Sequence, residues 1–204
     1  MRTKHFDICN KAIVIINIIV FLVLEIMGDT ESGIFMYDHG AMFPDAVLLN
    51  GEWYRLFTCM FIHFGIEHLG NNMLILFFLG DNLERAVGHI KYLLIYLLSG
   101  LCGSGLSMLY MLRSGDYAVS GGASGAIFGV IGALIYIVVR NRGKLEDLTA
   151  KRLIFMAALS LYHGFTATGV DNWAHVGGLV GGCVFAILLY RRKRRVETVY
   201  EWRD

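Results

Sequence analysis

The sequence is poor in proline and in charged residues. It contains one proline among 204 residues, and 17% of its residues are charged whereas 56% are hydrophobic. Such a composition is untypical of a soluble domain. No linker divides the chain. We therefore expect a single domain over residues 1–204, with a core at about 12–190 and a short basic tail at 191–204.

Motifs typical of metal and redox sites are also missing. The four cysteines are scattered without a CxxC pair, and the sequence contains no HExxH motif. This pattern disfavours disulfides, a metal centre and an intramembrane metalloprotease, and it favours packed thiols. No cofactor is implied. The basic run at residues 191–195 indicates an anchor on anionic headgroups rather than a nucleic-acid site.

What the sequence has in quantity is long apolar runs. Each approaches the ~17–25 residues that a helix needs to cross a bilayer. They lie at about residues 12–28, 69–83, 90–112, 121–139, 153–169 and 172–190. We therefore predict an all-α fold, a polytopic membrane protein with six transmembrane helices. The loop at about residues 29–67 is aromatic in its second half, so we expect it to be structured and partly sunk into the bilayer surface.

Basic residues are nearly absent from one side of this predicted bundle. With six spans, the N-terminus, residues 81–91, residues 140–152 and the tail share one face, which carries 16 of the 18 lysines and arginines. The positive-inside rule then places both termini in the cytoplasm. No small-x-small cleavage site follows the first apolar run, so we expect it to be kept as a helix. The plasma membrane is the expected location.

Two polar side chains stand at the start of apolar runs. Ser124 occurs in GASG at residues 122–125, and His175 occurs in AHVGG at residues 174–178. Polar groups at membrane depth are candidates for function. A serine with a histidine is the minimal pair for nucleophilic hydrolysis, in which the imidazole takes the hydroxyl proton. A serine bonded to a helix carbonyl and a packing histidine are the structural alternatives.

Glycines on the same two runs indicate how the pair would meet. Gly125 and Gly129 form one GxxxG pair, and Gly178 and Gly182 form another. Small faces let helix backbones approach closely in lipid. Both runs begin on the predicted outer side. Close packing of these helices would therefore bring the serine and the histidine together near the outer leaflet.

Further side chains are candidates for stabilising a reaction intermediate. His68 and Asn72 are four residues apart and share one helix face, from which both can donate a hydrogen bond to an oxyanion. Hydrogen bonding between helices is the alternative for this pair. Phe128 lies one turn after Ser124 and can stack on the ring of His175, although packing is the commoner role of a membrane phenylalanine.

The remaining ionisable residues receive structural interpretations. We interpret His63 as a structural loop histidine and leave His163 unassigned. Asp171 and Asp116 are interpreted as solvated loop charges. A Ser-His dyad is therefore favoured over a triad with an acid.

Taken together, these motifs resemble the rhomboid family of intramembrane serine proteases. The resemblance rests on residues 122–125, 174–178 and the HLGNN run at 68–72, and WYR at residues 53–55 resembles the motif of the family's first loop. It extends over about residues 53–182. The resemblance implies a six-helix bundle with a dyad in a water-filled cavity that opens outward. The implied oxyanion hole consists of His68, Asn72 and the backbone N–H of Ser124, and the implied supporting residues are Gly122, Gly125, Phe128, Gly178, Trp53 and Arg55.

The resemblance also implies a serine endopeptidase that cuts transmembrane proteins near the outer face. An intact helix hides its amides, so we expect single-pass substrates whose helices are weakened by glycine, proline or polar residues. The lipid bilayer is the other expected partner, nucleic acid is not, and the oligomeric state is left open. A non-enzymatic relative would typically lack the serine or the histidine. A transporter would need charges along a path, whereas Glu25 is the only clear charge in the middle of a run.

Overall fold

Six long helices account for most of the chain. The structure is a computed structural model that describes residues 8–145, 147–167 and 169–191. The long helices are α1 (Ile8–Met27), α5 (Gly65–Val87), α6 (His89–Ser114), α7 (Ser124–Arg140), α8 (Ala150–Thr166) and α9 (Asn172–Leu189). Each lies over one of the six predicted apolar runs. The residues at 192–195 of the predicted membrane anchor fall outside the described part of the chain.

The helix ends differ from the apolar runs for reasons of backbone geometry. Helix α5 begins at Gly65 rather than at residue 69. Its first turn contains polar residues such as Glu67, which lie outside the apolar run but still belong to the helix. Helix α7 begins only at Ser124, because Gly122 has φ +134° and interrupts any regular helix there. The serine is thus the first residue of its helix, where backbone N–H groups lack partners within the helix.

The loop before α5 is structured, as expected. It contains α2 (Gly33–Asp38), α3 (Pro44–Leu48), α4 (Arg55–Thr58) and the 3-10 helix η1 (Cys59–Phe61). The backbone of Met42 in this loop pairs with that of Ser120 through hydrogen bonds of 2.8 and 2.9 Å. This pairing joins the loop to the segment that leads into α7.

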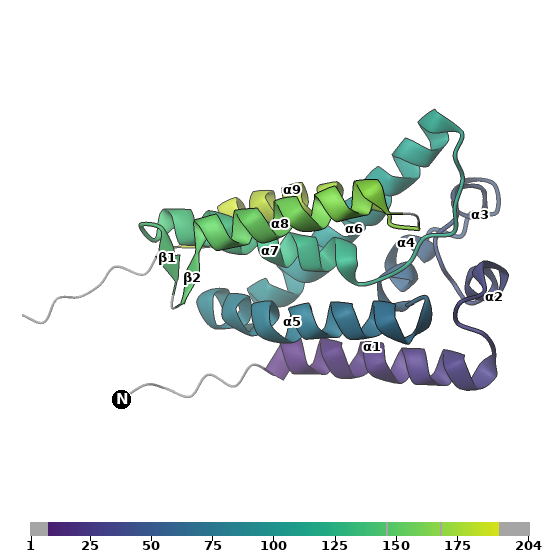
Figure 1. Ribbon diagram of the computed structural model, residues 1–204, viewed down its shortest axis with the longest axis horizontal. Helices are drawn as coiled ribbons and strands as arrows, with labels where there is room; N and C mark the ends of the chain where they lie inside the picture. The colour runs from purple at the N-terminus through teal and green to yellow at the C-terminus, as the bar shows by residue number, and fades with distance from the viewer. Residues whose placement is uncertain (1–7, 146, 168, 192–204) are drawn as a thin grey trace, which may run out of the picture.

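The short helices and the short strands lie at opposite ends of the bundle (Figure 1). Helices α2, α3 and α4 lie at one end. The start of α1 lies at the other end, together with the short antiparallel pair β1 (Lys144–Leu145) and β2 (Leu148–Thr149). This two-stranded pair departs slightly from the all-α expectation. Helix α1 runs alongside α5 at one edge of the bundle.

Helix α7 forms the centre of the bundle. Twelve of its 17 residues are buried, and it packs against α6 and α9. By length and composition α1, α6 and α9 are long and apolar enough to cross a membrane, and α7 is a shorter apolar helix. Large apolar side chains remain exposed on the outward faces of the bundle, as on Ile19 of α1 and Leu188 of α9. A lipid environment accepts such a surface, because lipid tails are themselves apolar.

Candidate active site

Glycines bring the backbones of α7 and α9 into direct contact. A Cβ added to Gly178 would collide with the carbonyl oxygen of Gly125, and one added to Gly182 would collide with that of Gly129. Helix α6 joins them, since a Cβ on Gly103 would lie 2.7 Å from the carbonyl oxygen of residue 174. The close packing expected from the GxxxG spacing is therefore present.

This packing places the two candidate catalytic side chains side by side. The Nε2 atom of His175 lies 2.9 Å from the Oγ of Ser124 and forms a hydrogen bond with it. The His175 side chain is buried, and its ring stacks on Phe128 with centroids 4.3 Å apart and planes 12° from parallel. Within the described residues, its Nδ1 atom has no hydrogen-bond partner. The ring therefore contacts Phe128 and the Ser124 hydroxyl, and no carboxylate of the described residues forms a hydrogen bond with it.

Gly122 allows the segment before Ser124 to pass close to α5. Its φ of +134° lies in a region that side chains with a Cβ disfavour. A Cβ at this position would also lie 2.8 Å from the ring of His68. The glycine thus permits both the turn into α7 and the approach of the histidine.

His68 and Asn72 share the face of α5 that looks toward the serine. Both line the cavity that also contains Ser124 and His175. Asn72 is buried, and its Nδ2 atom has no hydrogen-bond partner among the described residues. A buried amide donor without a partner is uncommon and invites an explanation. The adjacent Asn71 is exposed and also lines the cavity.

The cavity is large and has walls from several helices. Its volume is about 870 Å³. Helix α8 contributes Met156, Ser160 and His163, so the unassigned histidine lies at this site. Near the ends of α6 and α9, the rings of Tyr110 and Trp173 also line it and stack with centroids 4.7 Å apart.

Comparison with known proteins decides the family. A model of the Rhomboid domain matches residues 50–192. The chain belongs to the rhomboid family. Rhomboid protease GluP of Bacillus subtilis (strain 168) is 37% identical over 174 residues, which are 85% of this chain and 33% of that protein. RHOMBOID-like protein 2 of Arabidopsis thaliana is 42% identical over 155 residues, or 74% of this chain and 47% of that protein.

RHOMBOID-like protein 7 of Arabidopsis thaliana is 32% identical over 166 residues, covering 81% of this chain and 50% of that protein. The chain therefore spans between a third and a half of the length of these relatives. Together with the apolar helices, membership of the rhomboid family identifies an integral membrane protein with a helical bundle.

Trp53 and Arg55, expected as supporting residues from the resemblance of the first loop, are not among the residues that line the cavity. Trp53 is 57% exposed. Arg55 is buried and donates hydrogen bonds to the carbonyl oxygens of Tyr37 at 2.5 Å and Ala41 at 2.8 Å, and to the carboxylate of Glu52. The hydrogen bond from Arg55 lowers the pKa of the Glu52 carboxyl below its ordinary value. The arginine thus cross-links the loop.

Asp171 corrects the interpretation of a solvated loop charge. It is half-buried and caps α9, accepting a hydrogen bond of 2.9 Å from the backbone N–H of Ala174. Its other oxygen accepts hydrogen bonds of 2.5 Å from the hydroxyls of Ser107 and Ser120. The carboxylate therefore ties α6 and the segment before Ser124 to the start of α9. An aspartate directly before an apolar run is an N-cap signal, so this part was readable from the sequence.

His63 is buried and contacts the backbone of Ala123, the residue before Ser124. Its Nε2 atom accepts a hydrogen bond of 3.3 Å from the backbone N–H of Ala123. Burial lowers the pKa of His63 to about 3, so the ring is neutral and its nitrogen is free to accept. The structural interpretation fits this contact, which the spacing of the sequence did not reveal. Asp116 is exposed, as expected.

Proposed function

We propose that this chain is a serine endopeptidase that hydrolyses peptide bonds of transmembrane proteins, with Ser124 as nucleophile and His175 as general base. The observation that carries the proposal is the hydrogen bond of 2.9 Å between Nε2 and Oγ in the wall of a large cavity. The similarity to GluP of Bacillus subtilis, which is named a rhomboid protease, supports the same activity. GluP is about three times as long as the part of it that this chain matches. Its protease activity is therefore proposed, by similarity, for this chain.

The first step forms a covalent acyl-enzyme. The Oγ of Ser124 attacks the carbonyl carbon of the scissile bond while Nε2 of His175 takes the hydroxyl proton. This requires the imidazole tautomer with its proton on Nδ1. The developing oxyanion is stabilised by donors placed in advance, namely the Ser124 backbone N–H, Asn72 and His68. The position of the serine at the start of α7 adds the positive end of the helix dipole.

Collapse of the intermediate breaks the C–N bond. The imidazolium of His175 returns its proton to the departing amine. Water then attacks the acyl ester, the imidazole again takes a proton, and the free acid and the serine hydroxyl are restored. Stacking on Phe128 holds the ring in one orientation through these transfers, in the place of an acid.

For the membrane arrangement we propose that all six long helices cross the bilayer, with both termini in the cytoplasm of a plasma-membrane protein and residues 1–204 forming one domain. The asymmetry of lysine and arginine supports this orientation. The start of α1 and the β1–β2 pair lie at one end of the bundle, in agreement with a shared cytoplasmic side (Figure 1). The dyad then lies near the outer face.

The proposed substrates are single-pass membrane proteins whose helices are weakened by glycine, proline or polar residues. A regular helix uses its amides internally and offers no extended bond to the serine. A small residue at the cut suits a nucleophile at a helix start with glycines on both sides. The volume of the cavity, about 870 Å³, accommodates a short unwound segment.

Labelling with a fluorophosphonate probe tests the dyad directly. The purified full chain should label at Ser124, and an isocoumarin inhibitor should block the labelling. Ser124→Ala and His175→Ala should each lower cleavage of a model transmembrane substrate by at least about 10⁴-fold. Unchanged cleavage in either variant would reject the dyad. A folded protein that neither labels nor cleaves would point to a non-enzymatic binding protein instead.

Asn72→Ala tests the oxyanion hole separately. We expect kcat to fall by about 10²–10³-fold with little change in KM, because the donor acts on the transition state. Asn71→Ala is the matched comparison, and its expected loss is below tenfold. Equal losses in the two variants would remove Asn72 from the proposed hole.

A further inference from the structure

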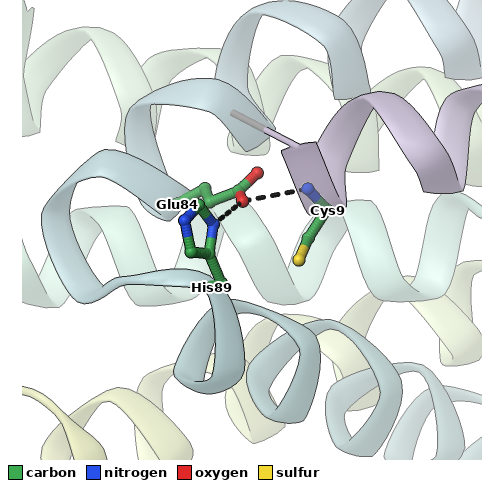
Figure 2. A group of neighbouring side chains, drawn as sticks. All are labelled: Cys9, Glu84 and His89. Carbon is green, nitrogen blue, oxygen red and sulfur yellow. Dashed lines mark hydrogen bonds and ion pairs between the residues drawn. The ribbon is translucent and has the colours of Figure 1, made fainter. Parts of the chain in front are cut away.

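Three side chains with different metal-binding atoms meet at the end of the bundle opposite to the dyad. Cys9 lies at the start of α1, Glu84 near the end of α5 and His89 at the start of α6 (Figure 2). One ligand atom from each lies within 4.8 Å of the other two. The Nδ1 atom of His89 lies 2.5 Å from an oxygen of Glu84. Among the residues described by the structure, no other such group of three occurs.

The carboxylate of Glu84 is fixed by the backbone around it. Glu84 is 2% exposed. One oxygen accepts a hydrogen bond of 3.0 Å from the backbone N–H of Cys9, and the other accepts one of 2.7 Å from that of Asn10. An oxygen held in this way is available as a ligand at a defined position, because carboxylate oxygens have further lone pairs.

A glycine turn brings His89 back over this carboxylate. Gly88, between α5 and α6, has φ +89°, which favours glycine. Its N–H donates to the carbonyl oxygen of Glu84 at 2.7 Å. The chain reverses within these residues, so the first side chain of α6 lies beside the last turn of α5. The His89 side chain is 44% exposed, which leaves a route for an ion from the aqueous side.

We propose that Cys9, Glu84 and His89 bind a zinc ion. Thiolate and imidazole ligands favour Zn²⁺ over the hard ions Mg²⁺ and Ca²⁺, which prefer oxygen alone. Three protein ligands leave a fourth tetrahedral position for water. This site is independent of the proteolytic activity, and it differs from the packed thiol that the sequence favoured for Cys9.

The movement needed to close the site is small. Zinc bonds of ~2.0–2.3 Å place neighbouring tetrahedral ligands roughly 3.3–3.6 Å apart. The His89 Nδ1 atom and the Glu84 oxygen, now 2.5 Å apart, must therefore separate by about 1 Å, and ligand atoms up to 4.8 Å apart must approach by about 1 Å. We expect rotation of the Cys9 and His89 side chains to supply both changes. Binding releases the thiol proton and requires an unprotonated Nδ1 on the imidazole, so the ring carries its proton on Nε2.

Such an ion would join three helices far from the chemistry. Glu84 follows His68 by 16 residues in α5, which corresponds to about 24 Å along the helix axis. The ion would hold the first turn of α1 on the corner between α5 and α6. Its expected effect is therefore on the stability of the bundle.

Cobalt is the probe for this site, because a bound thiolate gives Co²⁺ a charge-transfer band. The full chain in detergent, without a histidine tag and treated with a chelator, should bind one Co²⁺ and show the band, and Zn²⁺ should displace it. Cys9→Ser should abolish the band, and His89→Gln should weaken Co²⁺ binding by about a hundredfold or more, since changes behind the ligands already cost 10–100-fold. Cys102→Ser, at an exposed thiol, should retain the band.

The decisive variants are those at Cys9 and His89, because Glu84 also caps α1 and its replacement can prevent folding. Zinc should raise the melting temperature of the wild-type chain and of Cys102→Ser, and leave that of Cys9→Ser unchanged. A wild-type chain without the thiolate band, a band that persists in Cys9→Ser, or equal melting shifts in all variants would overturn the zinc site and leave Glu84 as a helix cap alone.

Discussion

Helices α9 and α8 both line the cavity, yet they are attached to the bundle in different ways. Helix α9 touches α7 through the backbone at Gly178 and Gly182, so the two helices have almost no freedom to shift. Helix α8 buries only Leu153, Ala157 and Gly164. Most of its large side chains are exposed. Backbone contact between α7 and α9 thus fixes the positions of Ser124 and His175, whereas the cavity wall formed by α8 is held by few buried side chains.

This difference suggests a division of tasks within one site. In the proposed reaction the serine and the histidine need positions fixed to a fraction of an ångström, since small errors in placement cost large factors in rate. A substrate of the proposed reaction would need an opening, and we expect α8, with only three buried residues, to provide it. Variants on the two sides of the cavity should therefore differ in both stability and dyad reactivity.

The largest effect is expected from Gly178→Ala. The added methyl group would collide with the carbonyl oxygen of Gly125, and two helix backbones have little room to relax. We expect destabilisation at or beyond the upper part of the usual ~1–3 kcal/mol for overpacking, together with loss of fluorophosphonate labelling. Thermal unfolding in detergent measures the first effect. Gly105→Ala, where a Cβ meets nothing within 4 Å, is the matched control and should stay folded and labelled.

Asp171→Ala should have the next largest effect. It removes a helix cap worth about 1 kcal/mol and leaves the hydroxyls of Ser107 and Ser120 without their acceptor, so a total loss of about 2 kcal/mol is expected. The labelling rate of Ser124 should fall about tenfold, because the segment before it is released. Asp116→Ala, at an exposed position, should match the wild type. Equal behaviour of the two aspartate variants would contradict the bridging role.

Phe128→Leu should have a moderate effect confined to the dyad. Aromatic stacking of this kind is worth about 0.5–1.5 kcal/mol, which corresponds to roughly two- to tenfold in the labelling rate. Phe128→Tyr keeps the ring and should retain the rate. If leucine and tyrosine at this position give the same labelling rate, the imidazole is oriented by something other than stacking.

Leu159→Ala in α8 should have the smallest effect. The side chain is 55% exposed on the outward face, so its removal leaves no cavity and should change the free energy of unfolding by less than about 0.5 kcal/mol. Labelling of Ser124 should also be unchanged. A loss of labelling as large as that in Asp171→Ala would show that α8 holds the dyad, and the contrast between the two helices would disappear.

The helices and the meeting of Ser124 with His175 could be predicted because lipid restricts the options. A chain in a bilayer must satisfy its backbone within helices, and small residues at four-residue spacing mark where two helices touch. Both signals are local and appear in a single stretch of sequence. The position of His68 and Asn72 on one face of α5 follows from helix periodicity in the same way.

Other contacts between distant segments, which rest on no small-residue spacing, could not be predicted. The bridge at Asp171 depends on hydroxyls 64 and 51 residues away, and nothing in the spacing indicates that they converge. Arg55 likewise bonds to carbonyl groups of a loop whose path no periodicity describes. The apolar run omits the first turn of α5, because that turn contains polar residues and hydropathy alone does not detect it.

The stacked pair of Tyr110 and Trp173 gives the cavity its own optical signal. Indole emission responds to the polarity and the contacts around the ring, and this indole stands in the cavity wall. The sequence has only two other tryptophans, Trp53 and Trp202. Replacing both with phenylalanine in a Ser124→Ala background would let the arrival of an unlabelled peptide be followed in real time, apart from any cleavage.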